Sequence, residues 1–317
     1  MKVHLPNSAF LGNIDSFIRA FDPNDETQLD ITSNPNWVSI HPMCSCIVGS
    51  LGLTVEDKSR IRVAPLIAKS RHYFKRIGLF KLIGIPSGFT VTEHDASGRF
   101  IPLSLIKKSD ELPEFITEMV PLLHIEPEYA EPIRYVMSEL IRNVLEHANS
   151  PFGALVCAQY YKDSHTIRLG VVDRGLGIKR TITVSHPASD DIAAIRLALT
   201  PGITGTTTRK MGGTELNAGA GLFFIKSIAK VNKDFFVIYS GNAMYKLLRD
   251  EKAKLNPDPF DDKHSKIANL PYWQGTAVGI DMSLKRHKKF EDLLDLIRDV
   301  YHKDVKDKRR FKKPKFI

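Results

Sequence analysis

Four separate segments of the chain carry residue types that could together bind a nucleotide. In the first, a predicted helix places Glu139 and Asn143 about one turn apart on the same polar face. A carboxylate there can orient or deprotonate an attacking water, and an amide oxygen is a suitable ligand for Mg²⁺. An amphipathic helix with a solvated polar face would show the same pattern, so this segment alone leaves both interpretations open.

The second segment is an apolar strand that ends in Asp173 and continues through Gly175 and Gly177. The strand would deliver a carboxylate to its C-terminal end, where the carboxylate can accept a hydrogen bond from an exocyclic amine such as that of adenine. The two glycines would let a ligand ring approach the backbone. Taken alone, the pattern also fits an ordinary tight turn.

The third segment opens a predicted helix with Gly219 and Gly221. Free N–H groups at a helix N-terminus bind phosphate well. The chain contains no Walker sequence, so a P-loop nucleotide site is excluded.

A polar, glycine-rich stretch at 202–215 precedes this helix and could close over bound phosphates as a lid. Its phosphate-binding candidates are Thr208, Arg209 and Lys210, with Arg209 or Lys210 as the cation for the terminal phosphate. A surface loop without a ligand is the alternative.

The fourth segment, Gly275-Thr276, starts a late strand. The hydroxyl of Thr276 could bridge the Asp173 carboxylate and the base.

In this order and spacing, the four segments resemble the GHKL, or Bergerat-fold, ATPase superfamily over about residues 110–283. The sequence from Glu139 to Ala148 is similar to the N box of anti-sigma-factor serine kinases and of stand-alone histidine-kinase-like ATPase domains. The resemblance implies ATP and Mg²⁺ as cofactors, with Glu139 as general base, Asn143 on the metal and Asp173 on adenine. It also implies a sandwich with helices on one face of a mixed sheet, and a possible homodimer.

Around these segments, the pattern of apolar residues predicts an α/β (α+β) protein. We expect three parts: a small α/β domain at 1–108, an ATP-binding domain at 109–285, and a C-terminal helix with a basic tail at 286–317. The predicted helices lie at 10–21, 43–51, 70–79, 109–123, 130–148, 191–199, 221–231 and 289–301. The predicted strands lie at 28–32, 37–40, 60–66, 154–161, 166–173, 235–239, 244–248 and 276–282, with a hairpin formed by 89–93 and 100–106.

The N-terminal part resembles a STAS domain in its strand Leu29-Asp-Ile-Thr32, followed by Trp37-Val-Ser-Ile-His-Pro42 and a helix. STAS antagonists carry a phosphorylated Ser or Thr just before that helix, whereas this chain has Pro42-Met43-Cys44. The comparison therefore implies a scaffold or a partner-docking role.

Composition favours an ordinary globular protein in a reducing compartment. The three cysteines form no CxxC pair and no even-numbered framework, and we therefore expect a cytoplasmic protein. The chain contains no run of about 18 consecutive apolar residues, so we predict no transmembrane helix. Residues 303–315 hold eight Lys or Arg against two Asp, so this tail accounts for +6 of the net charge of +9.

These features are compatible with three activities. The first is a Mg²⁺-dependent ATPase or partner-switch protein serine/threonine kinase that acts on a protein partner. The second is a nucleotide-gated binding module with little or no turnover. The third is a nucleic-acid-associated ATPase that uses the tail Lys303–Lys315. A sensor histidine kinase is disfavoured, because neither His94 nor His124 suits a phosphoacceptor helix.

Overall fold

A computed structural model describes residues 1–68, 70–89, 100–203, 221–252, 254–284 and 289–311 of the 317-residue chain. Its N-terminal part, residues 1–89, contains a three-stranded parallel sheet in the order β1-β3-β5 and a two-stranded parallel sheet of β2 and β4. The strands are β1 (Lys2–Leu5), β2 (Ser8–Ala9), β3 (Leu29–Ser33), β4 (Ser39–Ile40) and β5 (Ile61–Val63). The helices are α1 (Asp15–Ala20), α2 (Pro42–Thr54), α3 (Arg71–Arg76) and α4 (Leu79–Ile83).

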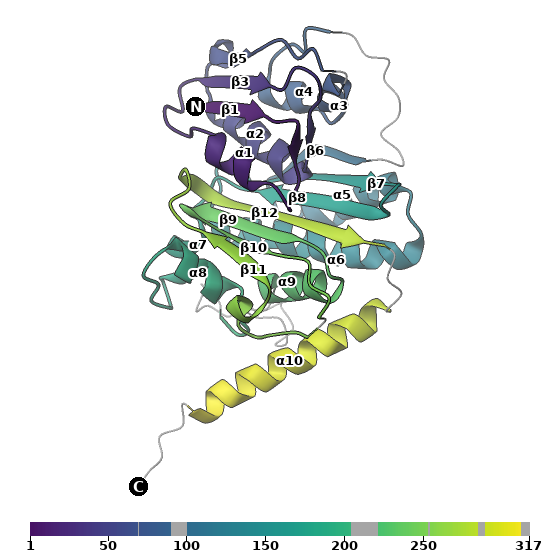
Figure 1. The fold of residues 1–317 in the computed structure, drawn as a ribbon, viewed down its shortest axis with the longest axis vertical. Helices are drawn as coiled ribbons and strands as arrows, with labels where there is room; N and C mark the ends of the chain where they lie inside the picture. Colours follow the sequence, from purple (N-terminus) through teal and green to yellow (C-terminus); the bar gives the residue numbers. More distant parts are fainter. Residues whose placement is uncertain (69, 90–99, 204–220, 253, 285–288, 312–317) are drawn as a thin grey trace.

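A seven-stranded sheet forms the middle of the molecule, in the order β11-β10-β9-β12-β8-β7-β6 (Figure 1). Neighbouring strands are antiparallel at every pairing, so the expectation of a mixed sheet is wrong for this sheet. Short connections such as that between β9 and β10 favour antiparallel neighbours, because parallel strands need long crossovers. The strands are β6 (Phe100–Ile106), β7 (Ala154–Tyr161), β8 (Thr166–Val172), β9 (Phe236–Gly241), β10 (Ala243–Leu247), β11 (His264–Ile267) and β12 (Trp273–Ser283).

Helices of the second part cover one face of this sheet. Tyr301 of α10 packs against Phe223 and Phe224 of α9, and Phe290 of α10 packs against Tyr135 of α6. The helices are α5 (Glu111–Met119), α6 (Pro127–Asn143), α7 (Ile178–Ile182), α8 (Asp191–Ala198), α9 (Gly221–Val231) and α10 (Phe290–Phe311). Short 3₁₀ helices cover Lys58–Arg60, Val120–Leu123 and Pro259–Asp261, and α6 continues into a π-helical turn at Val144–Ala148.

The N-terminal part covers the opposite face of the sheet through α2. This helix is buried from Pro42 through Gly52, as expected for a helix that is apolar on all sides. Gly170 of β8 makes the contact possible, because a Cβ atom there would lie 2.3 Å from the backbone nitrogen of Met43. The sheet therefore has two buried faces, one against α6 and α9 and one against α2.

Side chains along β7 show how the strands supply both cores. Leu155 and Cys157 belong to the core on the N-terminal side, whereas Val156 and Ala158 belong to the core under the helices. This alternation follows from the two-residue period of a strand.

The α+β fold class is confirmed, and two predicted segments differ from expectation. Strand β6 lies before the predicted boundary at 108, yet it pairs with β7 in the large sheet. Residues 90–93 of the predicted hairpin lie outside the described part of the chain. The last helix continues to Phe311, so the first residues of the predicted tail are helical.

No helix in the described ranges is long and apolar enough to cross a membrane.

Candidate functional site

Helix α6 places Glu139 and Asn143 at the edge of its buried face. Leu140 and Ile141 are buried in the core under the sheet, while the Glu139 side chain is 15% exposed and Asn143 is half-buried. The helix then widens into the π turn Val144–Ala148, a feature that often marks functional sites. The predicted polar pair is therefore only partly solvated.

The carboxylate of Glu139 pairs with a neighbour on its own helix. Its Oε1 atom lies 2.6 Å from Nη1 of Arg142, which is 47% exposed. Burial raises the pKa of Glu139, and the positive charge of Arg142 opposes this rise.

The start of α9 lies directly against this pair of side chains. A Cβ atom built on Gly221 would lie 3.0 Å from Oε2 of Glu139 and 3.5 Å from Nδ2 of Asn143. Nδ2 of Asn143 is buried and has no hydrogen-bond partner among the residues that the structure describes. A ligand that approaches the glycine could therefore reach both side chains and satisfy a polar group that is otherwise costly to bury.

Strand β8 delivers Asp173 to a buried turn. The Asp173 carboxyl accepts a hydrogen bond of 2.7 Å from the backbone N–H of Gly175, and the residue is 3% exposed. Its own N–H donates to the carbonyl of Thr276 over 2.9 Å. Burial raises the pKa of Asp173 to about 7, against the lowering effect of the backbone hydrogen bonds.

The glycines of this turn are required by close backbone contacts. A Cβ atom on Gly175 would lie 2.0 Å from the carbonyl oxygen of Ala148, and Leu176 N–H donates to that same oxygen over 2.7 Å. Gly177 has φ of 77°, a value that favours glycine. The end of the Asn143 helix and the Asp173 turn are thus hydrogen-bonded to each other.

Strand β12 closes the other side of the turn. Gly275 has φ of 106°, and a Cβ atom there would lie 2.3 Å from the carbonyl oxygen of Asp173. Two side chains that the sequence did not single out fix this contact: Ser240 and Gln274. Ser240 Oγ accepts from Ile178 N–H at 2.9 Å and donates to the Gly275 carbonyl at 2.6 Å.

Gln274 donates from Nε2 to the carbonyl of Gly175. The only sequence signal for Ser240 and Gln274 is that each is a polar residue beside a glycine at a strand end.

The structure therefore groups the described site residues into two clusters that are joined through Val144–Ala148. Glu139, Asn143 and Gly221 form one cluster. Asp173, Gly175, Gly177 and Thr276 form the other. The remaining predicted residues, Thr208, Arg209, Lys210 and Gly219, lie outside the described residues.

These clusters fit a nucleotide with its metal better than a metal alone. In the described ranges, no group of three or more His, Cys, Asp or Glu could hold a metal ion. An amide such as that of Asn143 is a suitable single protein ligand for Mg²⁺ whose other ligands are phosphates and water. The fit is supported by the unpartnered amide nitrogen of Asn143, which can donate to a phosphate oxygen, and by the close approach of the Gly221 backbone to the same side chain.

A separate groove of about 600 Å³ lies between α8 and the 3₁₀ helix Pro259–Asp261 and contains none of the predicted site residues. Its charged lining consists of Arg196, Asp258, Asp261 and Asp304, and Arg196 forms an ion pair with Asp258. The groove is therefore a surface feature apart from the two clusters.

Comparison of the chain with protein-family models and with curated proteins gives no match in either case.

Proposed function

We propose that this chain is a Mg²⁺-dependent ATP-binding protein of the GHKL type with a regulatory role, acting as an ATPase or as a partner-switch protein kinase. The observation that carries the proposal is the approach of Gly221 to Glu139 and Asn143. It brings the first and third sequence motifs together, although they are far apart in the chain. The bonds from Asp173 to Thr276 and Gly175 unite the second and fourth motifs in the same way.

In this proposal, each end of the site has its own task. Asp173 accepts a hydrogen bond from the amino group of adenine, and Gly175 and Gly177 leave room for the base. Asn143 contributes an amide oxygen to Mg²⁺, and the bound ion would neutralise phosphate charge that develops during transfer. The N-terminus of α9 faces the phosphates.

Glu139 would accept the proton of an attacking water or of a partner's hydroxyl group. Its raised pKa makes it a stronger base than an exposed carboxylate, because burial disfavours its charged form. Removal of a proton from the attacking oxygen contributes about 10²-fold to 10⁴-fold to a reaction of this kind.

The contact between Glu139 and Arg142 favours a second candidate, a nucleotide-gated binding module with little or no turnover. Pairing with the guanidinium at 2.6 Å opposes the rise in pKa that burial causes, so Glu139 is a weaker base than an unpaired carboxylate at the same burial would be. In this second case, ATP would change which protein docks on the chain, and phosphate transfer would be slow or absent.

Incubation with Mg²⁺ and ATP labelled at the γ-phosphate tests the proposal. The reaction is run with and without proteins encoded by neighbouring genes. Free labelled phosphate would support an ATPase, and a labelled partner protein would support a kinase. Bound but unconsumed ATP would support the binding module, and ATP that is neither bound nor consumed would overturn the proposal.

A further inference from the structure

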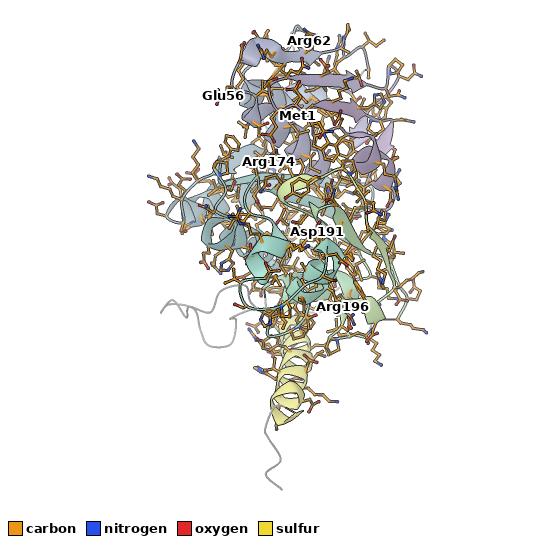
Figure 2. The ribbon with its side chains drawn as sticks, turned by 90° about the vertical axis from the view of Figure 1, so that its left-hand side faces the viewer. Met1, Glu56, Arg62, Arg174, Asp191 and Arg196 are labelled. Atoms are coloured by element: carbon orange, nitrogen blue, oxygen red, sulfur yellow. The ribbon has the colours of Figure 1, made fainter. Side chains whose placement is uncertain are left out.

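We propose that Arg174 is a positioning residue, through which the N-terminal part of the chain holds the Asp173 turn and sets the affinity of the site for ATP. The inference rests on the proposed function, because it concerns the adenine end of the same site. Arg174 lies between Asp173 and Gly175 in the sequence, and its side chain is 4% exposed. Figure 2 shows Arg174 at the junction between the N-terminal part and the large sheet.

The first contact of Arg174 with the N-terminal part is an ion pair. Its Nη2 atom pairs with Oε1 of Glu26, in the segment that joins α1 to β3. That segment is itself anchored, because the amino group of Met1 donates to the carbonyls of Asp25 and Gln28 at 2.8 and 2.7 Å. The backbone on both sides of Glu26 is therefore held in place near the guanidinium.

The second contact runs through Trp273, which is completely buried. The guanidinium carbon of Arg174 lies 4.8 Å from the centre of the Trp273 ring, and the ring of Phe21 meets Trp273 edge-on at 6.0 Å. Trp273 directly precedes Gln274, which bonds to Gly175. The N-terminal part thus contacts both the Asp173 turn and the strand that closes over it.

Charge compensation explains why Glu26 should matter to the turn. Burial lowers the pKa of the Arg174 guanidinium, and Glu26 is the strongest influence that opposes this. Nη1 of Arg174 has no hydrogen-bond partner in the described part of the chain. Without Glu26, a buried cation would lose its strongest source of compensation, and movement of Arg174 toward water would displace the adjacent Asp173.

Coupling of this kind works in both directions. If the N-terminal part raises the affinity for ATP, bound ATP must stabilise the contacts of the N-terminal part by the same free energy. The resulting device would let a protein that binds residues 1–89 alter nucleotide affinity at a distance.

Calorimetric titration of the full chain with ATP and Mg²⁺ tests this inference. Glu26→Gln removes the charge with little change of shape at a side chain that is 55% exposed, so the variant should fold. We expect its Kd for ATP to rise by about fivefold or more, the lower end of ordinary coupling between sites. Glu26→Asp retains the charge and should recover part of the affinity.

The matched control is Glu56→Gln, at an exposed carboxylate of the N-terminal part that is not among the charged groups acting on Arg174. Its Kd for ATP should equal that of the unmodified chain. The Kd for AMP should rise in Glu26→Gln by the same factor as that for ATP, because the two ligands share the adenine contact. A structural defect elsewhere in the site would raise the Kd for ATP and the Kd for AMP by different factors.

A Kd for Glu26→Gln within twofold of the unmodified chain would overturn the inference and leave the proposed function standing. A loss confined to ATP would also overturn it, since the effect would then lie at the phosphates. Absence of ATP binding by the unmodified chain would overturn the proposed function, and this inference with it.

Discussion

Asp173 is almost completely buried, and among the described residues backbone N–H groups and the neighbouring Arg174 help its carboxyl group to ionise. The folded chain ionises this group at about pH 7, whereas its ordinary pKa is 3.8. Between these values the native state binds more protons than the unfolded state. The free energy of unfolding contributed by Asp173 therefore falls as the pH rises from about 4 to about 7.

Asp173→Asn should consequently stabilise the nucleotide-free protein at pH 8. The amide keeps an oxygen that can accept from Gly175 N–H and removes the cost of a buried charge. We expect a gain of about 2–4 kcal/mol in the free energy of unfolding at pH 8, and a much smaller gain near pH 4. Urea unfolding at both pH values measures the difference, and a variant that is less stable at pH 8 would contradict this account.

In the proposed function, Glu139 is the residue on which the step from binding to catalysis would depend. Glu139→Gln should leave the Kd for ATP nearly unchanged and reduce phosphate release by about 10²-fold or more. Glu146→Gln is the matched control, because Glu146 lies on the same helix, is 51% exposed and also lies near Arg142. Unchanged hydrolysis in Glu139→Gln would show that another group takes the proton.

At the scale of elements, the sequence predicts a helix or strand well where one apolar periodicity extends over the whole element. Strand β7 and helix α9 have the predicted bounds, since each has a clear apolar pattern and a glycine or polar residue at its ends. The sequence does not predict β1, which is four residues long, or β11, whose burial pattern does not alternate cleanly. Such short strands are determined by their neighbours in the sheet rather than by their own residues.

Contacts between motifs could be predicted only through the family resemblance. Ser240 and Gln274 hold the glycine turns, yet a single polar residue beside a glycine is too common a pattern to single either of them out. Their partners, the carbonyls of Gly275 and Gly175, are backbone atoms that any residue would supply. Sequence periodicity contains no information on contacts of this kind.

Helix α9 provides a prediction at this scale. Gly221→Ala adds a methyl group 3.0 Å from Oε2 of Glu139, so the carboxylate must move although the helix itself would favour alanine. We expect the melting temperature to change by a few degrees at most, and ATP turnover to fall by about tenfold, as for a small misplacement of a catalytic group.

Gly12→Ala is the control for this variant, because its methyl group would lie 3.2 Å from Cζ of Phe235, away from the site. Its turnover should match that of the unmodified chain. Equal turnover in Gly221→Ala would instead mean that α9 does not face the reacting groups.

At the scale of the whole molecule, a buried polar cluster connects the two parts across the sheet. His41 caps α2 by accepting from Met43 N–H at 3.0 Å, and its Nε2 atom lies 3.3 Å from Oδ1 of Asp281 in β12. Arg168 lies 3.6 Å from the same carboxylate oxygen. The sequence shows that α2 is mostly apolar, but it does not show that α2 packs on the second face of the seven-stranded sheet.

Acid should weaken this junction. Burial lowers the pKa of His41 below its ordinary value of 6.5, although Asp281 opposes the shift. The unfolded chain therefore binds a proton that the native chain does not, and stability from His41 is lost as the pH falls below about 6.5. The effect is opposite in sign to that of Asp173.

His41→Asn keeps a capping oxygen and should lose less stability between pH 7 and pH 5 than the unmodified chain does. His4→Asn, at an exposed histidine, should behave like the unmodified chain. Urea midpoints at the two pH values make the comparison. If His41→Asn loses as much stability between pH 7 and pH 5 as the unmodified chain, His41 is not the source of the acid sensitivity.

The central claim, an ATP site between Glu139 and Thr276, is tested most directly by calorimetric titration with ATP and Mg²⁺. The unmodified chain should bind ATP, and Asp173→Asn should bind it at least about tenfold more weakly, because a buried acceptor for the adenine amino group is lost. The affinity of the unmodified chain should also rise as the pH increases through about 7, where Asp173 becomes ionised. Absence of binding, or equal binding by Asp173→Asn, would contradict the account.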